Sequence, residues 1–162
     1  MTVAHQARLE ELVEKLRERG YRVTPQRIAI LKILALSDGH PSAERIYDQI
    51  KEEFPTTSLA TVYKTIATLK EMGEVLELGF PNGSNRYDGN KAYPHTHLIC
   101  VKCHDIMDPE VEDLDILPEQ VAQRAGYRLV SHRFDIYGIC PRCQSAEFGI
   151  CASPIPNQRS PA

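Results

Sequence analysis

Two Cys-x-x-Cys pairs, Cys100/Cys103 and Cys140/Cys143, constrain this 162-residue chain more than any other feature. Each pair lets two sulfurs approach one ion from a single turn, and two such turns complete the tetrahedral four-sulfur shell that Zn²⁺ accepts with no open position. The 36 residues between Cys103 and Cys140 exceed a compact zinc ribbon, but a helix and a strand between the pairs accommodate them. A thioredoxin-type redox pair is the competing interpretation. The spacing favours a structural zinc site that joins the first and last strands of a C-terminal domain.

Composition and charge narrow the protein class. With 42% hydrophobic residues the chain can bury a core, and its longest apolar stretch, 28–36, is broken by Lys32, so we expect a soluble, cytoplasmic protein. In that compartment paired cysteines favour metal chemistry over disulfides. Residues 1–90 carry 12 basic and 13 acidic side chains, and the rest carry 7 and 9. A DNA-binding protein with this balance must concentrate its positive charge on one face.

The first 88 residues predict a winged helix-turn-helix domain. Apolar residues at helical spacing predict four helices, over residues 9–19, 25–36, 42–54 and 58–72. Thr24 followed by Pro25 gives the second helix an N-cap and a proline at its first position. Alternation over 75–78 and 85–88 around a turn at 81–84 predicts a β-hairpin. The helix over 58–72 is the candidate recognition helix of this domain, which we place at 1–88.

A second domain, α+β in class, is expected after a polar hinge at 89–94. Strands are predicted over 97–103 and 105–108, a helix over 118–125 with Pro118 at its first position, and a long alternating strand over 128–138 that runs into Cys140. We place this domain at 95–150. The proline-rich tail, 151–162, is expected to be disordered.

The candidate recognition helix carries its apolar residues on one stripe. Ala60, Thr61, Tyr63, Lys64, Thr65 and Thr68 are therefore expected on or near the open face. Tyr63 can stack on base edges or thymine methyls, and Lys64 can meet phosphate or guanine. Arg22 and Arg27 are placed to hold the DNA backbone. An ordinary solvated helix face is the alternative.

The sequence contains a second set of candidate metal ligands. His95-x-His97 puts two imidazoles on one side of an extended segment, and His40, Asp88 and Asp108 are the remaining candidate ligands. Three nitrogens and two carboxylates suit Fe²⁺, Mn²⁺ or Zn²⁺. Spacing supports only the His95/His97 pair, because an isolated His40 is more often a helix-start residue and an isolated Asp88 is more often a strand-end carboxylate.

Four strings of the sequence together resemble the ferric uptake regulator (Fur) family. They are GYRVTPQR at 20–27, SLATVY at 58–63, HTHLICVKC at 95–103 and IYGICPRC at 136–143, and the resemblance spans about residues 7–145. It implies a homodimer through the second domain, a four-cysteine zinc site there, and a regulatory metal between the two domains. The regulatory ligands then fall on His40, Asp88, His95, His97 and Asp108.

The residue type at the two carboxylate positions indicates whether the protein senses peroxide or iron. The iron-uptake branch usually has Glu at both, whereas the peroxide-sensing branch has Asp at both, as at Asp88 and Asp108 here. The resemblance thus implies a repressor that binds Fe²⁺ or Mn²⁺, senses H2O2 through oxidation of His40 or His95, and releases palindromic operator DNA. An iron-responsive regulator, or another metal-uptake regulator acting by reversible metal binding, is the alternative.

Two alternative functions and several departures from the family pattern were also considered. The His-x-Glu of zinc deaminases is missing, since His95 is followed by Thr-His, so we expect no enzyme; a zinc-storage or scaffold protein is a further alternative. Pro94 and Thr96 replace ligands of an additional family metal site, which we expect to be absent and which leaves His132 without its usual partners. His104 is expected to be a surface histidine and Cys151 a free thiol.

Overall fold

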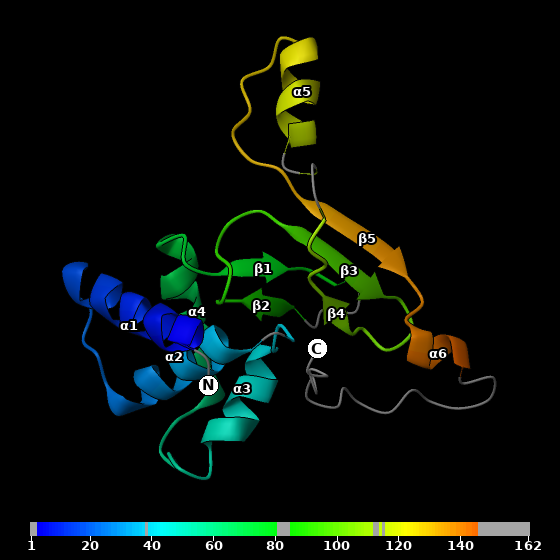
Figure 1. The fold of residues 1–162 in the computed structure, drawn as a ribbon. Helices are drawn as coiled ribbons and strands as arrows, with labels where there is room; N and C mark the ends of the chain where they lie inside the picture. Colours follow the sequence, from blue (N-terminus) through cyan, green and yellow to red (C-terminus); the bar gives the residue numbers. More distant parts are fainter. Residues whose placement is uncertain (1–2, 38, 81–84, 112–113, 115, 146–162) are drawn as a thin grey trace. The chain divides into compact units, whose positions relative to one another are not determined.

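The computed structural model describes residues 3–37, 39–80, 85–111, 114 and 116–145. They form two compact units, Met1–Tyr93 (unit 1) and Pro94–Ala162 (unit 2), and the predicted hinge at 89–94 spans the boundary between them (Figure 1). The predicted turn at 81–84, Cys151 and the predicted tail lie outside the described residues. Among the described residues, no helix has the length and apolar character needed to cross a membrane.

Unit 1 contains four helices, α1 (Val3–Glu18), α2 (Pro25–Leu36), α3 (Ala43–Ile50) and α4 (Leu59–Glu71). Three begin at a hydroxyl N-cap, because the side chains of Thr24, Ser42 and Ser58 accept backbone N–H bonds three residues on, at 3.3, 3.3 and 3.2 Å. Four helices are thus confirmed. The third ends at Ile50, earlier than the predicted 54.

The core of unit 1 is formed by the inward faces of these helices. Leu12 and Leu16 of α1 meet Leu31 and Leu34 of α2, all fully buried, and Ile46, Val62, Ile66 and Leu69 complete the cluster. Ile28, in the first turn of α2, is 38% exposed and lies outside this core.

A β-hairpin follows the helices. β1 (Leu76–Leu78) pairs antiparallel with β2 (Arg86–Asp88), with Leu76 opposite Asp88. Tyr87 is buried with the helical core, and its backbone N–H donates to the carbonyl of Pro41 at 3.1 Å, so β2 is anchored beside the start of α3. The predicted hairpin is confirmed, and four helices with a hairpin make unit 1 a winged helix.

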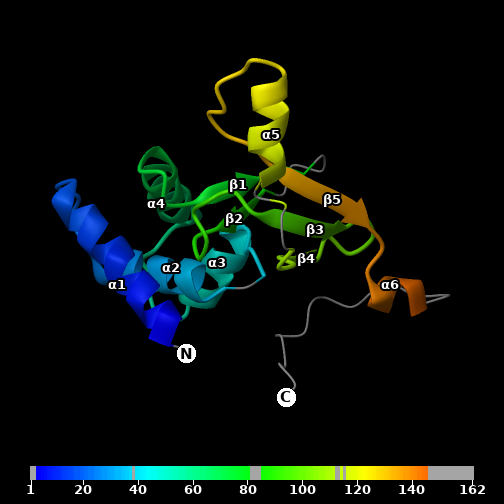
Figure 2. The same cartoon turned by 45° about the horizontal axis from the view of Figure 1, so that its top comes forward.

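Unit 2 is built on a three-stranded sheet. Its strands are β3 (Thr96–Cys100), β4 (Ile106–Met107) and β5 (Phe134–Gly138), in the order β4-β3-β5, with β3 antiparallel to β4 and parallel to β5 (Figure 2). Two helices, α5 (Ile116–Arg124) and α6 (Pro141–Ser145), precede and follow β5. Helices and small sheets together give the predicted α+β class.

Several features of unit 2 differ from the prediction. β3 ends at Cys100 rather than at residue 103, because residues 101–103 form a turn. β5 begins at Phe134 rather than at residue 128; its partner β3 begins opposite it at Thr96, and Pro94 just before β3 has no N–H to extend the ladder. The helix begins two residues before Pro118, which is tolerated in the first helical turn because those N–H groups need no partner. Helix α6 was not predicted.

Candidate metal sites and DNA-binding surface

The four cysteines of the two Cys-x-x-Cys pairs come together at one end of the β3–β5 strand pair. Cys100 ends β3, Cys140 follows β5 by two residues, and Cys143 lies in α6. The backbone N–H of Val101 donates to the Gly138 carbonyl at 2.9 Å, which continues the parallel ladder to this end. The strand pairing therefore brings together two turns that are far apart in the sequence.

The spacing of the sulfurs fits a tetrahedral ion. The four Sγ atoms all lie within 4.8 Å of one another, and those of Cys103 and Cys140 are 3.7 Å apart. Zn–S bonds of about 2.3 Å give a regular tetrahedron with edges of about 3.8 Å. A disulfide requires about 2.05 Å. The cluster is thus a four-thiolate zinc site and not a pair of disulfides.

The backbone around the cluster stabilises thiolate. Burial tends to raise the pKa of the Cys100 thiol, but backbone N–H groups of Cys140, Cys103 and Lys102 outweigh it and lower that pKa to about 6. The Cys140 N–H lies 3.3 Å from the Cys100 sulfur. Burial raises the pKa of Cys103 to about 11. One ligand is therefore ready to bind as thiolate, and a zinc ion supplies the positive charge that displaces the remaining protons.

Two of the predicted regulatory ligands meet in unit 1. His40, at φ 45°, directly precedes the α3 N-terminal segment, and Asp88 ends β2; both are buried. Their Nε2 and Oδ2 atoms are 3.5 Å apart. The other oxygen of Asp88, Oδ1, accepts backbone N–H bonds from Asn90 at 2.9 Å and Lys91 at 3.0 Å. The turn after β2 thus fixes the carboxylate with Oδ2 directed at His40.

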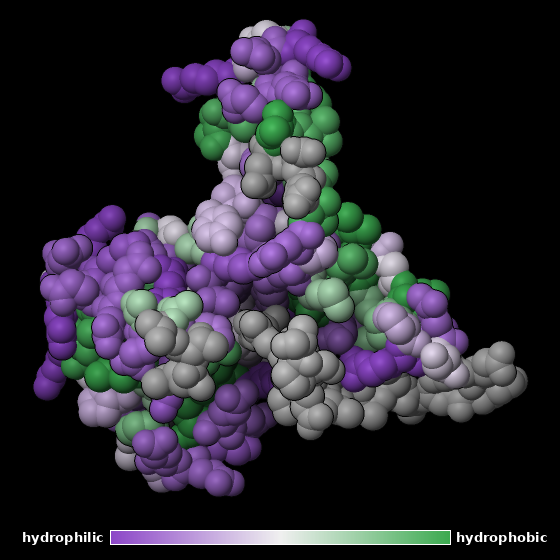
Figure 3. Space-filling view, in the orientation of Figure 1, coloured by the Kyte–Doolittle hydropathy of each residue, from purple (hydrophilic) through white to green (hydrophobic). Residues whose placement is uncertain are grey.

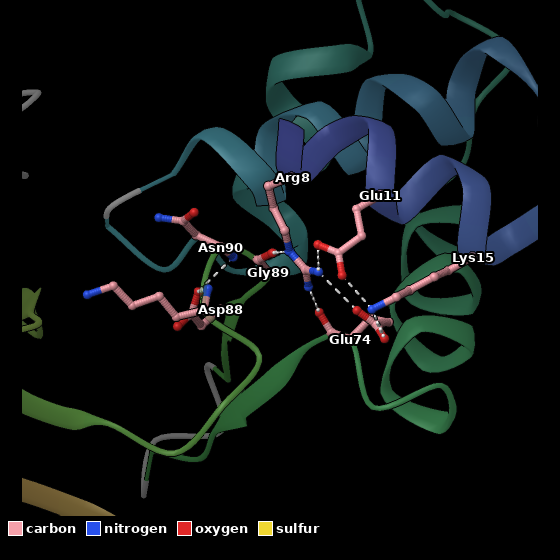
Figure 4. A network of polar contacts seen from close by, with 8 residues as sticks. Arg8, Glu11, Lys15, Glu74, Asp88, Gly89 and Asn90 are labelled. Atoms are coloured by element: carbon pink, nitrogen blue, oxygen red, sulfur yellow. Dashed lines mark hydrogen bonds and ion pairs between the residues drawn. The ribbon is translucent and has the colours of Figure 1, made fainter. Parts of the chain in front are cut away.

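An arginine of α1 secures the same turn (Figure 4). Arg8 donates from Nε to the Gly89 carbonyl at 2.9 Å and from one terminal nitrogen to the Glu74 carbonyl at 2.9 Å, while the other terminal nitrogen binds the Glu74 carboxylate at 3.0 Å. Lys15 binds the second oxygen of Glu74. Gly89 packs so closely on α2 that a Cβ would lie 2.7 Å from the Leu34 Cβ. The residue next to Asp88 is therefore held from two sides.

The other three predicted ligands meet in unit 2. Pairing of β3 with β4 brings Asp108 to His95, with Oδ2 and Nε2 3.3 Å apart. The imidazole ring of His97 lies next to that of His95, with centroids 4.3 Å apart. Imidazoles and carboxylates together form a donor set suited to Fe²⁺, Mn²⁺ or Zn²⁺. Each unit thus presents its own part of the predicted ligand set.

Sequence reasoning missed Asp135 at this location. It is the register partner of His97 on the parallel strand β5, and its Oδ1 lies 3.3 Å from Nδ1 of His97. Asp135 stands in the alternating stretch that the sequence does show. Its opposition to His97 depends on the β3–β5 register, which local sequence does not encode.

The candidate recognition helix α4 keeps part of its expected open face. Tyr63 is 44% exposed and Lys64 is exposed, and the Tyr63 hydroxyl donates to a carboxylate oxygen of Glu44 on α3 at 2.5 Å. Thr65 and Thr68 are buried, against expectation. Their hydroxyls donate to backbone carbonyls one turn earlier in α4, so their side chains turn back on the helix.

The two arginines expected at the DNA backbone differ in exposure and in their contacts within the protein. Arg22 is exposed. The guanidinium of Arg27 donates to the Arg22 carbonyl at 2.7 Å and lies 5.9 Å from the Tyr21 ring centroid, so Arg27 also braces the segment before α2.

His104 and His132, which have no predicted role, can be placed in the structure. His104 was expected at the surface but is half-buried, and it adopts φ 58°, in the left-handed region that glycine enters most readily. His132 lies edge-on to Phe134, with ring centroids 5.6 Å apart.

A winged helix followed by a small α+β unit with a four-cysteine zinc site and clustered His/Asp ligands defines a metal-binding transcriptional regulator. Residues 18–137 match the model of the ferric uptake regulator family. The chain belongs to this family.

Individual relatives agree with this assignment. The chain is 41% identical to the peroxide-responsive repressor PerR of Staphylococcus saprophyticus over 144 residues, 88% of this chain and 95% of that protein. The structure of Helicobacter pylori Fur, described as revealing three functional metal-binding sites, covers 89% of this chain and 96% of its own, with TM-score 0.75 and 25% identity. The Campylobacter jejuni peroxide stress regulator covers 88% and 100%, with TM-score 0.64 and 32% identity.

Proposed function

We propose that this protein is a repressor that binds palindromic operator DNA in a metal-bound form and releases it when H2O2 oxidises a ligand histidine. The observation that carries the proposal is the identity of the carboxylates that meet the ligand histidines: Asp88 beside His40, and Asp108 beside His95. Aspartate at both positions is the pattern of the peroxide-sensing branch. The 41% identity to a peroxide-responsive repressor supports the same signal.

The regulatory ion would be held by ligands from both units. His40 and Asp88 belong to unit 1, whereas His95, His97 and Asp108 belong to unit 2, so binding of one Fe²⁺ or Mn²⁺ ion by all five favours one orientation of the units. A preference of about 3 to 5 kcal/mol converts mostly open molecules into mostly closed ones. In a dimer, that orientation sets the distance between the two α4 helices and hence the match to operator half-sites.

Peroxide would act on the ligands themselves. When bound, Fe²⁺ with five protein ligands supplies an open position and the redox chemistry for H2O2. An oxygen atom added to the imidazole of His40 or His95 weakens that side chain as a metal ligand. The ion then no longer holds the two units in one orientation. Mn²⁺ supports DNA binding without this oxidation.

A homodimer through unit 2 is part of the proposal. Among the residues that the structure describes, 15 large hydrophobic side chains are exposed, and 12 of them lie in unit 2, including Val121, Val130, Ile136 and Tyr137. Apolar surface is seen along β5 and the lower part of α5 (Figure 3). Within the described part of unit 2 the buried apolar side chains are Ile99, Cys100, Ile106, Pro118 and Cys143, a small core that a second copy would enlarge.

DNA contact is assigned to the exposed face of α4. Tyr63 and Lys64 would meet the major groove, and Arg22 and Arg27 the phosphates. Since the overall charge is −3, binding to a palindrome rather than to any DNA depends on this face being presented twice at the right spacing.

Mass spectrometry tests the peroxide signal. Protein loaded with Fe²⁺ and treated with H2O2 should gain one oxygen atom on His40 or His95 and should stop retarding a palindromic promoter fragment in gels. Mn²⁺-loaded protein is the matched control and should stay unmodified and bound. If the Fe²⁺ form stays unmodified and leaves DNA only when iron is withdrawn, the protein is an iron-responsive regulator instead.

A further inference from the structure

Asp135 is an acidic side chain at the regulatory ligands to which the five-ligand set gives no role. It lies on β5 directly across from His97 on β3, and the two side chains are largely buried, at 16% and 4% exposed. Its Oδ2 binds the guanidinium of Arg133 at 2.5 Å, which leaves Oδ1 facing the imidazole. The carboxylate is thus held by an arginine on one side and presents its other oxygen to a metal ligand.

The contact selects one form of the histidine ring. A neutral imidazole carries a proton on one nitrogen and a lone pair on the other, and a metal binds the nitrogen with the lone pair. Carboxylate oxygens only accept hydrogen bonds, so Oδ1 of Asp135 favours the tautomer of His97 with its proton on Nδ1. At 3.3 Å the two atoms are within hydrogen-bond distance but are not aligned for a hydrogen bond, which forms once the imidazole ring turns towards Oδ1.

His95 faces its neighbouring carboxylate through a different ring nitrogen than His97 does. Its neighbouring carboxylate, Asp108, approaches Nε2 from the β4 side, whereas Asp135 approaches Nδ1 of His97 from the β5 side. His95, directly before β3, and His97, within it, therefore each face a carboxylate, and the two carboxylates come from opposite sides of β3. One of these carboxylates belongs to the predicted ligand set, and the other lies against the opposite nitrogen of the second ring.

We propose that Asp135 is a positioning residue of the regulatory site, which holds His97 with its proton on Nδ1 and its Nε2 lone pair available to the ion. The proposal rests on the proposed function in taking His97 as a ligand. Carboxylates that accept the second N–H of a metal-binding histidine fix its ring and raise its basicity, and their loss costs about 10- to 100-fold in metal affinity.

The tautomer is tested without the regulatory metal. Long-range ¹H–¹⁵N spectra of the full-length, zinc-loaded protein, free of Fe²⁺ and Mn²⁺ at mildly alkaline pH, should show the His97 proton on Nδ1. Asp135→Ala should shift His97 towards the other tautomer, and Asp135→Asn should shift it less because the amide oxygen still accepts. Arg133→Ala, the matched control, removes the partner of Oδ2 and should leave the tautomer in place.

Mn²⁺ titration provides the second measurement. Asp135→Ala should bind Mn²⁺ about 10- to 100-fold more weakly than the wild type, with an unchanged zinc content and unfolding midpoint. A proton on Nε2 in the wild type, or an alanine variant unchanged in both measurements, overturns the proposal. Weaker Mn²⁺ binding with an unchanged tautomer makes Asp135 a direct ligand instead. A wild type that binds no Mn²⁺ defeats the proposed function, while the spectra still decide the role of Asp135.

Discussion

Removal of the Arg8 side chain should destabilise unit 1 far more than removal of a neighbouring arginine. Arg8 and Glu74 are 11% and 12% exposed, and the Arg8 guanidinium binds the Glu74 carboxylate, the Glu74 carbonyl and the Gly89 carbonyl at 2.9 to 3.0 Å. Arg17, nine residues further along α1, makes an ion pair with Glu14 in which both side chains are more than 60% exposed. The two arginines differ mainly in burial.

The magnitude follows from that burial. Removing one partner of a fully buried ion pair costs about 3 to 5 kcal/mol, and an exposed pair contributes about 0 to 1 kcal/mol. The Arg8 contacts lie between these limits, since Lys15 remains beside Glu74 and water can reach the vacated carbonyls. We therefore expect Arg8→Ala to lower the free energy of unfolding of unit 1 by about 2 to 3 kcal/mol. Arg17→Ala should lower it by less than about 0.5 kcal/mol.

Native-state hydrogen exchange measures the effect in unit 1. The amides of Ile30 and Leu31 lie in the middle of the core, and their slowest exchange reports the global opening of the unit. Arg8→Ala should speed their exchange by about 30- to 150-fold, the ratio that corresponds to 2 to 3 kcal/mol. Equal, small effects of Arg8→Ala and Arg17→Ala would refute the argument that these buried contacts stabilise unit 1.

Three further changes test the zinc site, the turn after β2 and the hairpin. Cys103→Ser should lose zinc in elemental analysis and abolish cooperative folding of unit 2 in circular dichroism, whereas Cys151→Ser should keep both. Gly89→Ala should lower stability to urea by about 1 to 3 kcal/mol because its Cβ would meet α2 at 2.7 Å, while Gly79→Ala, with its nearest atom at 4.0 Å, should be tolerated. Burial raises the pKa of Tyr87 to about 12, so its contribution to stability is complete below pH 10 and is lost between pH 10 and 12; Tyr87→Phe should flatten that part of the stability profile.

Local sequence predicted unit 1 well because its elements are set by short-range chemistry. A hydroxyl residue followed by an apolar 3.6-residue repeat marks the start of α2, α3 and α4, and the N-cap bonds of Thr24, Ser42 and Ser58 realise it. The exposed face of α4 was less predictable. Helical position placed Thr65 and Thr68 near the surface, but their hydroxyls bond within the helix, and so both fit a buried environment.

Unit 2 was harder to predict because its structure depends on contacts between distant residues. The alternation over 128–138 is present in the sequence, yet strand structure begins at Phe134, where β3 provides a partner. The same parallel pairing places Asp135 opposite His97, and no spacing within the sequence indicates that register. The residue types of the metal ligands could be recognised in the sequence. The position of the Asp135 carboxylate next to His97 could be recognised only from the pairing of β3 with β5.

The zinc site and the pair formed by His97 and Asp135 share the same two strands. β3 carries His97 and ends at Cys100, and β5 carries Asp135 and leads to Cys140. Because side chains of a strand point to a new face when the register slips by one residue, the two turns that the cysteines join also fix which residue of β5 faces His97. The four-cysteine site therefore does more than close a small core: it helps to set the strand register that places Asp135 opposite His97, one of the predicted regulatory ligands.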